Sequence, residues 1–178
     1  MRVIAGAARG IRLLPVPGDL IRPTSDRVRE SLFNILAPRL SGCRFLDLFT
    51  GTGANGIEAL SRGAGTVVLV DEARESLTIV RDNLVRTKLT GDVHVHQLNL
   101  PRQLAHIRPA FDIIFADPPY AFHQHEALLQ GITEAKLLAP EGVFVLEHAK
   151  KTMVPESVGP LSRVREAKYG NTSLSLYA

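Results

Sequence analysis

The tetrapeptide Asp117-Pro118-Pro119-Tyr120 places a carboxylate, two prolines and an aromatic ring directly after the apolar run 111–116. A proline pair continues neither a strand nor a helix, so the chain must leave the strand there in a stiff turn. Open α/β sheets bind ligands at the carboxyl ends of their strands. A rigid turn with hydrogen-bond acceptors and a flat apolar face suits a planar group that carries an NH2, such as a nucleobase. An ordinary strand-terminating turn is the alternative.

A second set of candidate residues surrounds a glycine-rich loop. Residues 47–56 read DLFTGTGANG and follow an apolar strand. The glycines let the backbone approach a ligand closely, and Asp71, 20 residues after Gly51, ends the next strand, where it can accept hydrogen bonds from a ribose diol. These features indicate a nucleoside-containing cofactor. Because Gly51 to Gly56 also matches GxGxxG, an NAD-type oxidoreductase is an open alternative.

Asp47 bears on the choice of cofactor. A pyrophosphate prefers helix N-termini and neutral or positive surroundings, so a carboxylate four residues before the first glycine disfavours a dinucleotide. S-adenosylmethionine carries a sulfonium and an ammonium group and no phosphate, and it is the cofactor that we expect. In addition, a hydride transfer does not require the carboxylate, the proline pair and the aromatic ring of the turn at 117–120. A Walker loop is excluded because no Lys-Ser/Thr pair follows the glycines.

The apolar pattern predicts the elements that would position these residues. Expected strands cover 45–48, 66–70, 93–95, 111–116 and 143–146. Expected helices cover 54–61 and 73 to about 88, and one or two more helices cover 125 to about 138. Such an alternation predicts an α/β fold with a mostly parallel sheet covered on both faces. Residues 163–169 and 173–177 flank Gly170-Asn171, which predicts a closing antiparallel hairpin.

The length of 178 residues fits a single domain over residues 1–178. Residues 1–20 read as a basic N-terminal hairpin extension with short strands at 2–5 and 11–14. Residues 21–178 read as the catalytic core, which opens with a helix that Pro38 ends.

The net charge of +3 is unevenly distributed. Residues 1–30 carry six arginines against three acids, and residues 149–178 carry five basic against two acidic side chains, so each end sums to +3 and the middle to −3. Basic ends around an acidic centre favour contact with a polyanion such as nucleic acid. The candidates for phosphate contacts are Arg2, Arg9, Arg12 and Arg22.

Composition excludes several other classes. The single cysteine, Cys43, rules out a disulfide framework and a CxxC metal site and fits a reducing cytosol. No apolar stretch reaches the roughly 18 residues of a membrane span. None of the six histidines has an acid or cysteine at ligand spacing. We therefore expect a soluble cytoplasmic protein without a metal and without membrane contact.

Four motifs together resemble a known family. They are RPTSDRVRESLFN at 22–34, LDLF at 46–49 with the glycines that follow, DPPY at 117–120 and YGNT at 169–172. In this order, over nearly the whole chain, they are similar to the bacterial 16S ribosomal RNA guanine-N2 methyltransferases. The resemblance implies a class I S-adenosylmethionine-dependent methyltransferase (Rossmann-like) sheet of seven strands, with the last strand antiparallel.

The resemblance also implies roles for particular residues. Asp47, Gly51 and Gly53 would surround the methionine part of the cofactor, and Asp71 would bind the ribose. Thr24 and Arg27 would close the methionine end. Adenine would lie at Asn99 and Leu100, where such enzymes usually have an acid in place of Asn99; its amide oxygen can still accept a hydrogen bond.

For catalysis, Asp117 and the Pro118 carbonyl would accept hydrogen bonds from the NH2 group and aim its lone pair at the methyl group, while Tyr120 would stack on the base. A base inside a duplex cannot reach such a pocket, so the nucleotide must be unpaired or flipped. The resemblance implies a guanine of the guanine-966 type in 16S ribosomal RNA, in an assembling or assembled small subunit. We expect a monomer.

Three alternatives stay open on the sequence. Another exocyclic amine, adenine N6 of DNA or a protein glutamine, would keep the reaction type. An NAD-type oxidoreductase would change it. A catalytically silent module would bind RNA without transferring a methyl group.

Overall fold

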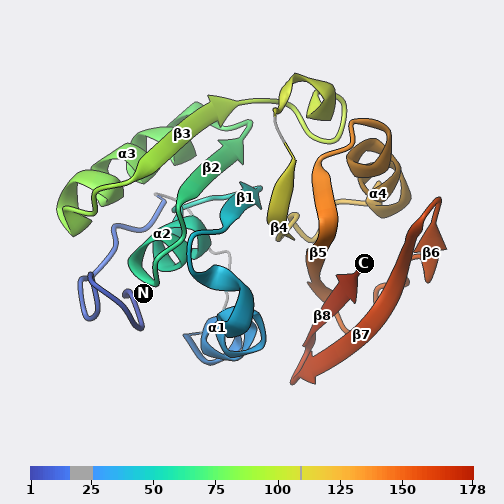
Figure 1. Ribbon diagram of the computed structural model, residues 1–178, viewed down its shortest axis with the longest axis horizontal. Coiled ribbons are helices and arrows are strands. Elements are labelled where there is room, and N and C mark those ends of the chain that lie inside the picture. Colours follow the sequence, from blue (N-terminus) through green and yellow to red (C-terminus); the bar gives the residue numbers. More distant parts are fainter. Residues whose placement is uncertain (17–25, 109) are drawn as a thin grey trace.

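The computed structural model describes residues 1–16, 26–108 and 110–178 (Figure 1). In these ranges the helices are α1 (Asp26–Leu40), α2 (Ala54–Ser61), α3 (Arg74–Thr87), the short 3-10 helix η1 (Leu104–His106) and α4 (His125–Glu134). The strands are β1 (Arg44–Leu48), β2 (Thr66–Asp71), β3 (Asp92–Gln97), β4 (Phe111–Ala116), β5 (Leu138–Ala149), β6 (Ser157–Val158), β7 (Leu161–Tyr169) and β8 (Thr172–Tyr177).

These strands form one sheet in the order β3-β2-β1-β4-β5-β8-β7-β6. Strands β1 to β5 pair in parallel, whereas β8 is antiparallel to both β5 and β7. The mostly parallel sheet and its closing hairpin are thereby confirmed. The predicted number of strands was one too low, because β6 is only two residues long and exists through its pairing with β7.

Helices cover both faces of the sheet, as the near-continuous apolar strands predicted. Successive side chains of a strand point to opposite faces. In β1, Phe45 joins a core cluster that includes buried residues of α1, α2 and α3. Leu46 and Leu48 join a second cluster that includes residues of η1 and α4. Figure 1 shows α4 and α1 on opposite sides of the sheet.

The helix α2 packs closely on β2. A methyl group added at Gly56 would come within 2.7 Å of Leu69 Cδ2, so the glycine allows the helix to pack directly on the strand. The preceding Gly53 has φ of 80°, a left-handed conformation that suits glycine. The glycine-rich loop is therefore held between β1 and a tightly packed helix.

The expected N-terminal hairpin is shorter than predicted. The chain does fold back, and Arg2 faces Arg12 in an isolated antiparallel bridge. The two arms also share backbone hydrogen bonds, from Val3 N to the Ile11 carbonyl at 3.0 Å and from Gly10 N to the Val3 carbonyl at 2.9 Å. At the turn the backbone bonds to α2 instead: Ala7 N donates to the Ser61 carbonyl at 2.8 Å and Ala8 N to Ser61 Oγ at 2.9 Å. The segment 1–14 is thus attached along the side of α2.

Two predicted helix ends were wrong. The helix α1 continues past Pro38 to Leu40, so the proline lies in its last turn. The helix predicted over 125–138 ends at Glu134, because Lys136 has φ of 51° and β5 begins at Leu138. No helix in the described ranges is long and apolar enough to cross a membrane.

Candidate active site

Several loops meet at one edge of the sheet. The parallel strands β1, β2, β4 and β5 all end there, and the turn between β7 and β8 lies at the same edge because β8 runs antiparallel to β5. A cleft of about 770 Å³ follows this edge and is lined by residues of these loops. The sequential order of the strands reverses between β1 and β4, the place where open α/β sheets bind ligands.

The cleft brings together some of the predicted site residues and not others. Those that line it are Gly51, Asp71, Leu100, Asp117, Pro118 and Tyr120. Those that lie outside its lining are Arg2, Arg9, Arg12, Arg27, Asp47, Gly53 and Asn99. Thr24 and Arg22 fall outside the residues that the structure describes.

Asp47 is buried beneath the glycine-rich loop, with 1% of its surface exposed. Its Oδ2 accepts hydrogen bonds from Thr50 Oγ1 at 2.6 Å and from Gly56 N at 2.9 Å, so the carboxylate fixes both ends of the loop. Burial raises the pKa of Asp47 to about 7, the two hydrogen bonds oppose that rise, and the charges of Asp117 and Asp71 add to it. Asp71 and Asp117 therefore lie close enough to Asp47, at the same edge of the sheet, for their charges to act on it.

Asp71 connects two of the loops that line the cleft. It ends β2 and is half-buried. Its Oδ2 accepts a hydrogen bond from Gly51 N and its Oδ1 one from Ala73 N, each at 2.9 Å. A carboxylate oxygen accepts more than one hydrogen bond, so Asp71 retains acceptor capacity for ligand hydroxyls.

Asn99 is exposed and is oriented by its neighbours. Its Nδ2 donates to Glu72 Oε2 at 2.6 Å, and its backbone N donates to Gln103 Oε1 at 2.7 Å. The amide hydrogens of Asn99 are thereby directed toward Glu72. The next residue, Leu100, is buried and lines the cleft.

The turn at 117–120 begins where β4 ends beside β1. Asp117 N donates to the Leu48 carbonyl at 3.4 Å, and the Pro119 carbonyl accepts from Phe122 N at 2.8 Å, which closes the turn. The Asp117 side chain is half-buried, whereas 74% of the surface of Tyr120 is exposed. The turn thus offers acceptors inside the cleft and an aromatic ring at its mouth.

An aromatic group supports this turn. The Phe122 ring packs edge-to-face against Phe49 and against His125, with 5.2 Å between ring centroids in each pair. All three residues line the cleft. Rings of this kind supply a flat apolar wall, which suits a planar ligand.

Sequence reasoning missed the residues that follow β4 and end β5. Glu147, His148 and His125 are buried and line the cleft. Desolvation by burial lowers the pKa of both histidines, so they are neutral at neutral pH. His148 Nε2 lies 2.9 Å from Ser175 Oγ. A usable signal existed, because Glu147-His148 ends the fifth predicted strand much as Asp117 ends the fourth.

The described ranges also lack the side-chain groups that bind metal ions. They contain no group of three or more His, Cys, Asp or Glu side chains placed to hold a metal ion.

The whole sequence, residues 1–178, matches the family described as Conserved hypothetical protein 95. The chain belongs to this family. It is 41% identical over 180 residues to YlbH of Bacillus subtilis (strain 168), provisionally named an rRNA methyltransferase, with 99% of this chain and 98% of that protein covered. It is 36% identical over 178 residues to the ribosomal RNA small subunit methyltransferase D of Escherichia coli (strain K12), with 99% and 89% covered.

This member of the Conserved hypothetical protein 95 family is also similar in three dimensions to a protein of known structure. YhhF of Escherichia coli, provisionally named a methyltransferase, superposes with a TM-score of 0.85 at 37% sequence identity, covering 99% of this chain and 96% of that one. The class I methyltransferase fold expected from the motifs is thereby confirmed, with eight strands in the sheet.

Proposed function

We propose that this protein transfers a methyl group from S-adenosylmethionine to the exocyclic N2 of a guanine in the ribosomal RNA of the small subunit. The observation that carries the proposal is that the Asp117-to-Tyr120 turn and the glycine-rich loop line one cleft at the switch point of the sheet. The names of the relatives support ribosomal RNA as the substrate class. A site of the guanine-966 type is the finer expectation.

The residues at the cleft fit the methyl donor. S-adenosylmethionine, when bound, supplies an activated methyl group on a sulfonium. The charges of Asp71 and Asp117 act on Asp47, so these carboxylates make this edge of the sheet favourable for a cation. Asp71 would accept from the ribose hydroxyls, and Leu100 would contact the adenine ring. The carbonyl oxygen of Asn99 would be free to accept because its Nδ2 already donates to Glu72.

The turn fits an acceptor amine. The Asp117 carboxylate and the Pro118 carbonyl would each accept one hydrogen of the NH2 group, which turns the nitrogen lone pair away from them. The exposed ring of Tyr120 would stack on the base and hold its plane. On this proposal the protein contributes mainly alignment, and the cofactor carries the reactivity.

Methylation mapping tests the proposal. Small subunits and naked 16S RNA from cells that lack this activity would be incubated with labelled S-adenosylmethionine, and the modified nucleotide would be located by digestion and mass spectrometry. We expect N2-methylguanine at a single position of the RNA, and the two substrates show whether an assembled particle is needed. Label in DNA or protein, or on another nucleotide, would overturn the assignment.

Tyr120 offers a separate check on the acceptor side. Base stacking on an aromatic side chain contributes about 1–3 kcal/mol, so Tyr120→Ala should lower kcat/KM for RNA by about ten- to hundredfold. Tyr120→Phe should retain most of the activity because it keeps the ring. The melting temperature and the affinity for S-adenosylhomocysteine should not change, since the side chain is exposed. An unchanged kcat/KM in Tyr120→Ala would remove the stacking role.

A further inference from the structure

Two buried side chains in the cleft hold polar atoms that have no hydrogen-bond partner among the described residues. They are Nε and Nη1 of Arg29 and Oδ1 of Asn55. Arg29 is 1% exposed and Asn55 is 9% exposed, and both line the cleft. A buried polar group without a hydrogen bond destabilises the protein, and a charged one does so more strongly. Because both residues line the cleft, a ligand bound there is the expected source of the missing partners.

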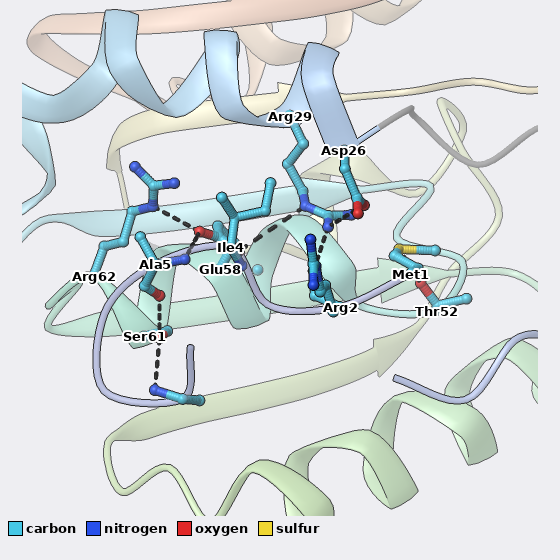
Figure 2. Close-up of polar contacts among 12 residues, drawn as sticks. Met1, Arg2, Ile4, Ala5, Asp26, Arg29, Thr52, Glu58, Ser61 and Arg62 are labelled. Carbon is cyan, nitrogen blue, oxygen red and sulfur yellow. Dashed lines mark hydrogen bonds and ion pairs between the residues drawn. The ribbon is translucent and has the colours of Figure 1, made fainter. Parts of the chain in front are cut away.

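The structural contacts of Arg29 use only part of its guanidinium (Figure 2). Its Nη2 donates to the Arg2 carbonyl and, at 2.9 Å, to Asp26 Oδ1. Its Nε lies 3.9 Å from Glu58 Oε2, too far for a hydrogen bond. The guanidinium therefore keeps donors that these contacts do not use.

Glu58 does not depend on Arg29 for its hydrogen bonds. The carboxylate accepts from Ile4 N at 2.8 Å, Ala5 N at 3.0 Å and Arg62 Nε at 2.7 Å. Figure 2 shows Arg62 and Arg29 reaching Glu58 from different directions. The buried acid thus has three hydrogen-bonding donors without Arg29, so it leaves Nε and Nη1 of Arg29 without a hydrogen-bond acceptor although the two side chains form an ion pair.

The unsatisfied atoms complement an α-amino-acid group. Arg29 offers cationic donors, which suit a carboxylate, and Asn55 offers an acceptor, which suits an ammonium. Asn55 lies in the first turn of α2, directly after the glycine-rich loop. S-adenosylmethionine ends in such a carboxylate and ammonium pair, whereas a nicotinamide dinucleotide does not.

We infer that Arg29 and Asn55 bind the amino-acid end of the methyl donor, Arg29 its carboxylate and Asn55 its ammonium group. This inference rests on the proposed function and names residues for one end of the same site. Arg27, to which the family resemblance assigned this end, is exposed and lies outside the lining of the cleft.

A comparison of two ligands by calorimetry tests the inference. S-adenosylhomocysteine carries the amino-acid group, and methylthioadenosine has the same adenosine and sulfur without it. Arg29→Gln should weaken S-adenosylhomocysteine about ten- to hundredfold, the usual range for a hydrogen bond to a charged group, and Asn55→Ala about threefold to tenfold. Both variants should bind methylthioadenosine like the wild type. Arg81→Gln, an exposed arginine on α3, is the matched control and should alter neither affinity.

Folding is checked by thermal unfolding, because Arg29 also contacts Asp26 and Arg2. Asn55→Ala carries the test alone if Arg29→Gln does not fold, since the side chain of Asn55 has no hydrogen bond to the described residues that the change would break. Equal weakening of both ligands, or no weakening of either, would overturn the inference. If the wild type binds neither ligand, the proposed function itself fails, which is a distinguishable result.

Discussion

Among the residues of the site, Asp47 has a strongly raised pKa. A carboxyl group that is 1% exposed and accepts two hydrogen bonds, from Thr50 and Gly56, is costly to ionise. Its pKa is raised from 3.8 to about 7, with burial as the largest cause. A cationic ligand beside it would favour the ionised form and relieve part of this cost.

The raised pKa predicts a dependence of stability on pH. Between about pH 4 and 7 the folded state holds a proton that the unfolded state has lost, so this group's contribution to the free energy of unfolding decreases as the pH rises. Asp47→Asn cannot titrate. The melting temperature of the variant, relative to that of the wild type, should therefore rise from pH 5 to pH 8.

Thermal unfolding of both proteins at four pH values across that range measures this difference. Asp82→Asn, at an exposed carboxylate on α3, serves as the control. Melting curves of wild type and Asp47→Asn that shift in parallel with pH would show that Asp47 does not titrate in this window.

The sequence predicted those site residues that motifs mark. Asp71 and Asp117 end strands at one edge of a parallel sheet, so the sequence pattern predicts that they lie together. Arg29 and Asn55 could not be found in this way, because what distinguishes them is an unsatisfied atom at a cleft. That property depends on packing between α1 and α2, and no local pattern of residues carries it.

At the scale of elements, α2 connects the glycine-rich loop to the N-terminal segment 1–14. Its first turn follows the glycine-rich loop, and its later residues Glu58 and Ser61 bind the backbone of the N-terminal segment 1–14. Val3, Ala8 and Leu13 pack against the same helix. A basic segment is thereby positioned relative to the glycine-rich loop.

Gly6 tests this attachment. It has φ of +82°, and a methyl group there would lie 1.8 Å from the Ser61 carbonyl oxygen, so Gly6→Ala must displace the segment. Gly10 has φ of +85° with no atom within 4 Å, so Gly10→Ala carries the backbone strain alone, about 1 kcal/mol. We expect Gly6→Ala to lower the melting temperature and the RNA affinity more than Gly10→Ala does.

Thermal unfolding and filter binding with 16S RNA compare the two glycine variants. Affinity for S-adenosylhomocysteine serves as the internal control and should be retained in both. Equal effects of Gly6→Ala and Gly10→Ala on RNA affinity would show that the contact with Ser61 does not position the segment for RNA.

Long apolar elements were predicted well because burial on both faces leaves a strong signal. The central strand β4 was predicted over 111–116 and spans Phe111–Ala116. Short elements were predicted less well, since β6 forms through its partner strand and the turn of the N-terminal hairpin bonds to Ser61 of α2. In both cases long-range contacts decide the structure, and a local pattern does not contain them.

At the scale of the whole molecule, the charges divide between an acidic cleft and basic ends. Arg9 and Arg12 are exposed on the N-terminal segment, which suits contact with phosphates. If each contacts one phosphate, Arg9→Ala with Arg12→Ala should weaken RNA binding and reduce the slope of log K against log salt by about 1.4–1.8. Affinity for S-adenosylhomocysteine should be unchanged.

A salt series with 16S RNA measures that slope. Arg108→Ala is the matched control, because Arg108 is exposed and precedes β4, at the edge of the sheet opposite the cleft. RNA binding that is equal to the wild type at every salt concentration would exclude these two arginines as phosphate contacts.

The position of β8 has a consequence for how the molecule is made. This strand comes last in the described order but lies between β5 and β7, and its Tyr177 hydroxyl donates to the Pro155 carbonyl at 2.8 Å. During synthesis both flanking strands are completed before it, and each presents an unpaired edge until β8 inserts. Open edges recruit strands of other chains. A chain that stops short of Thr172 would therefore be prone to aggregation. Folding to a soluble protein thus depends on β8.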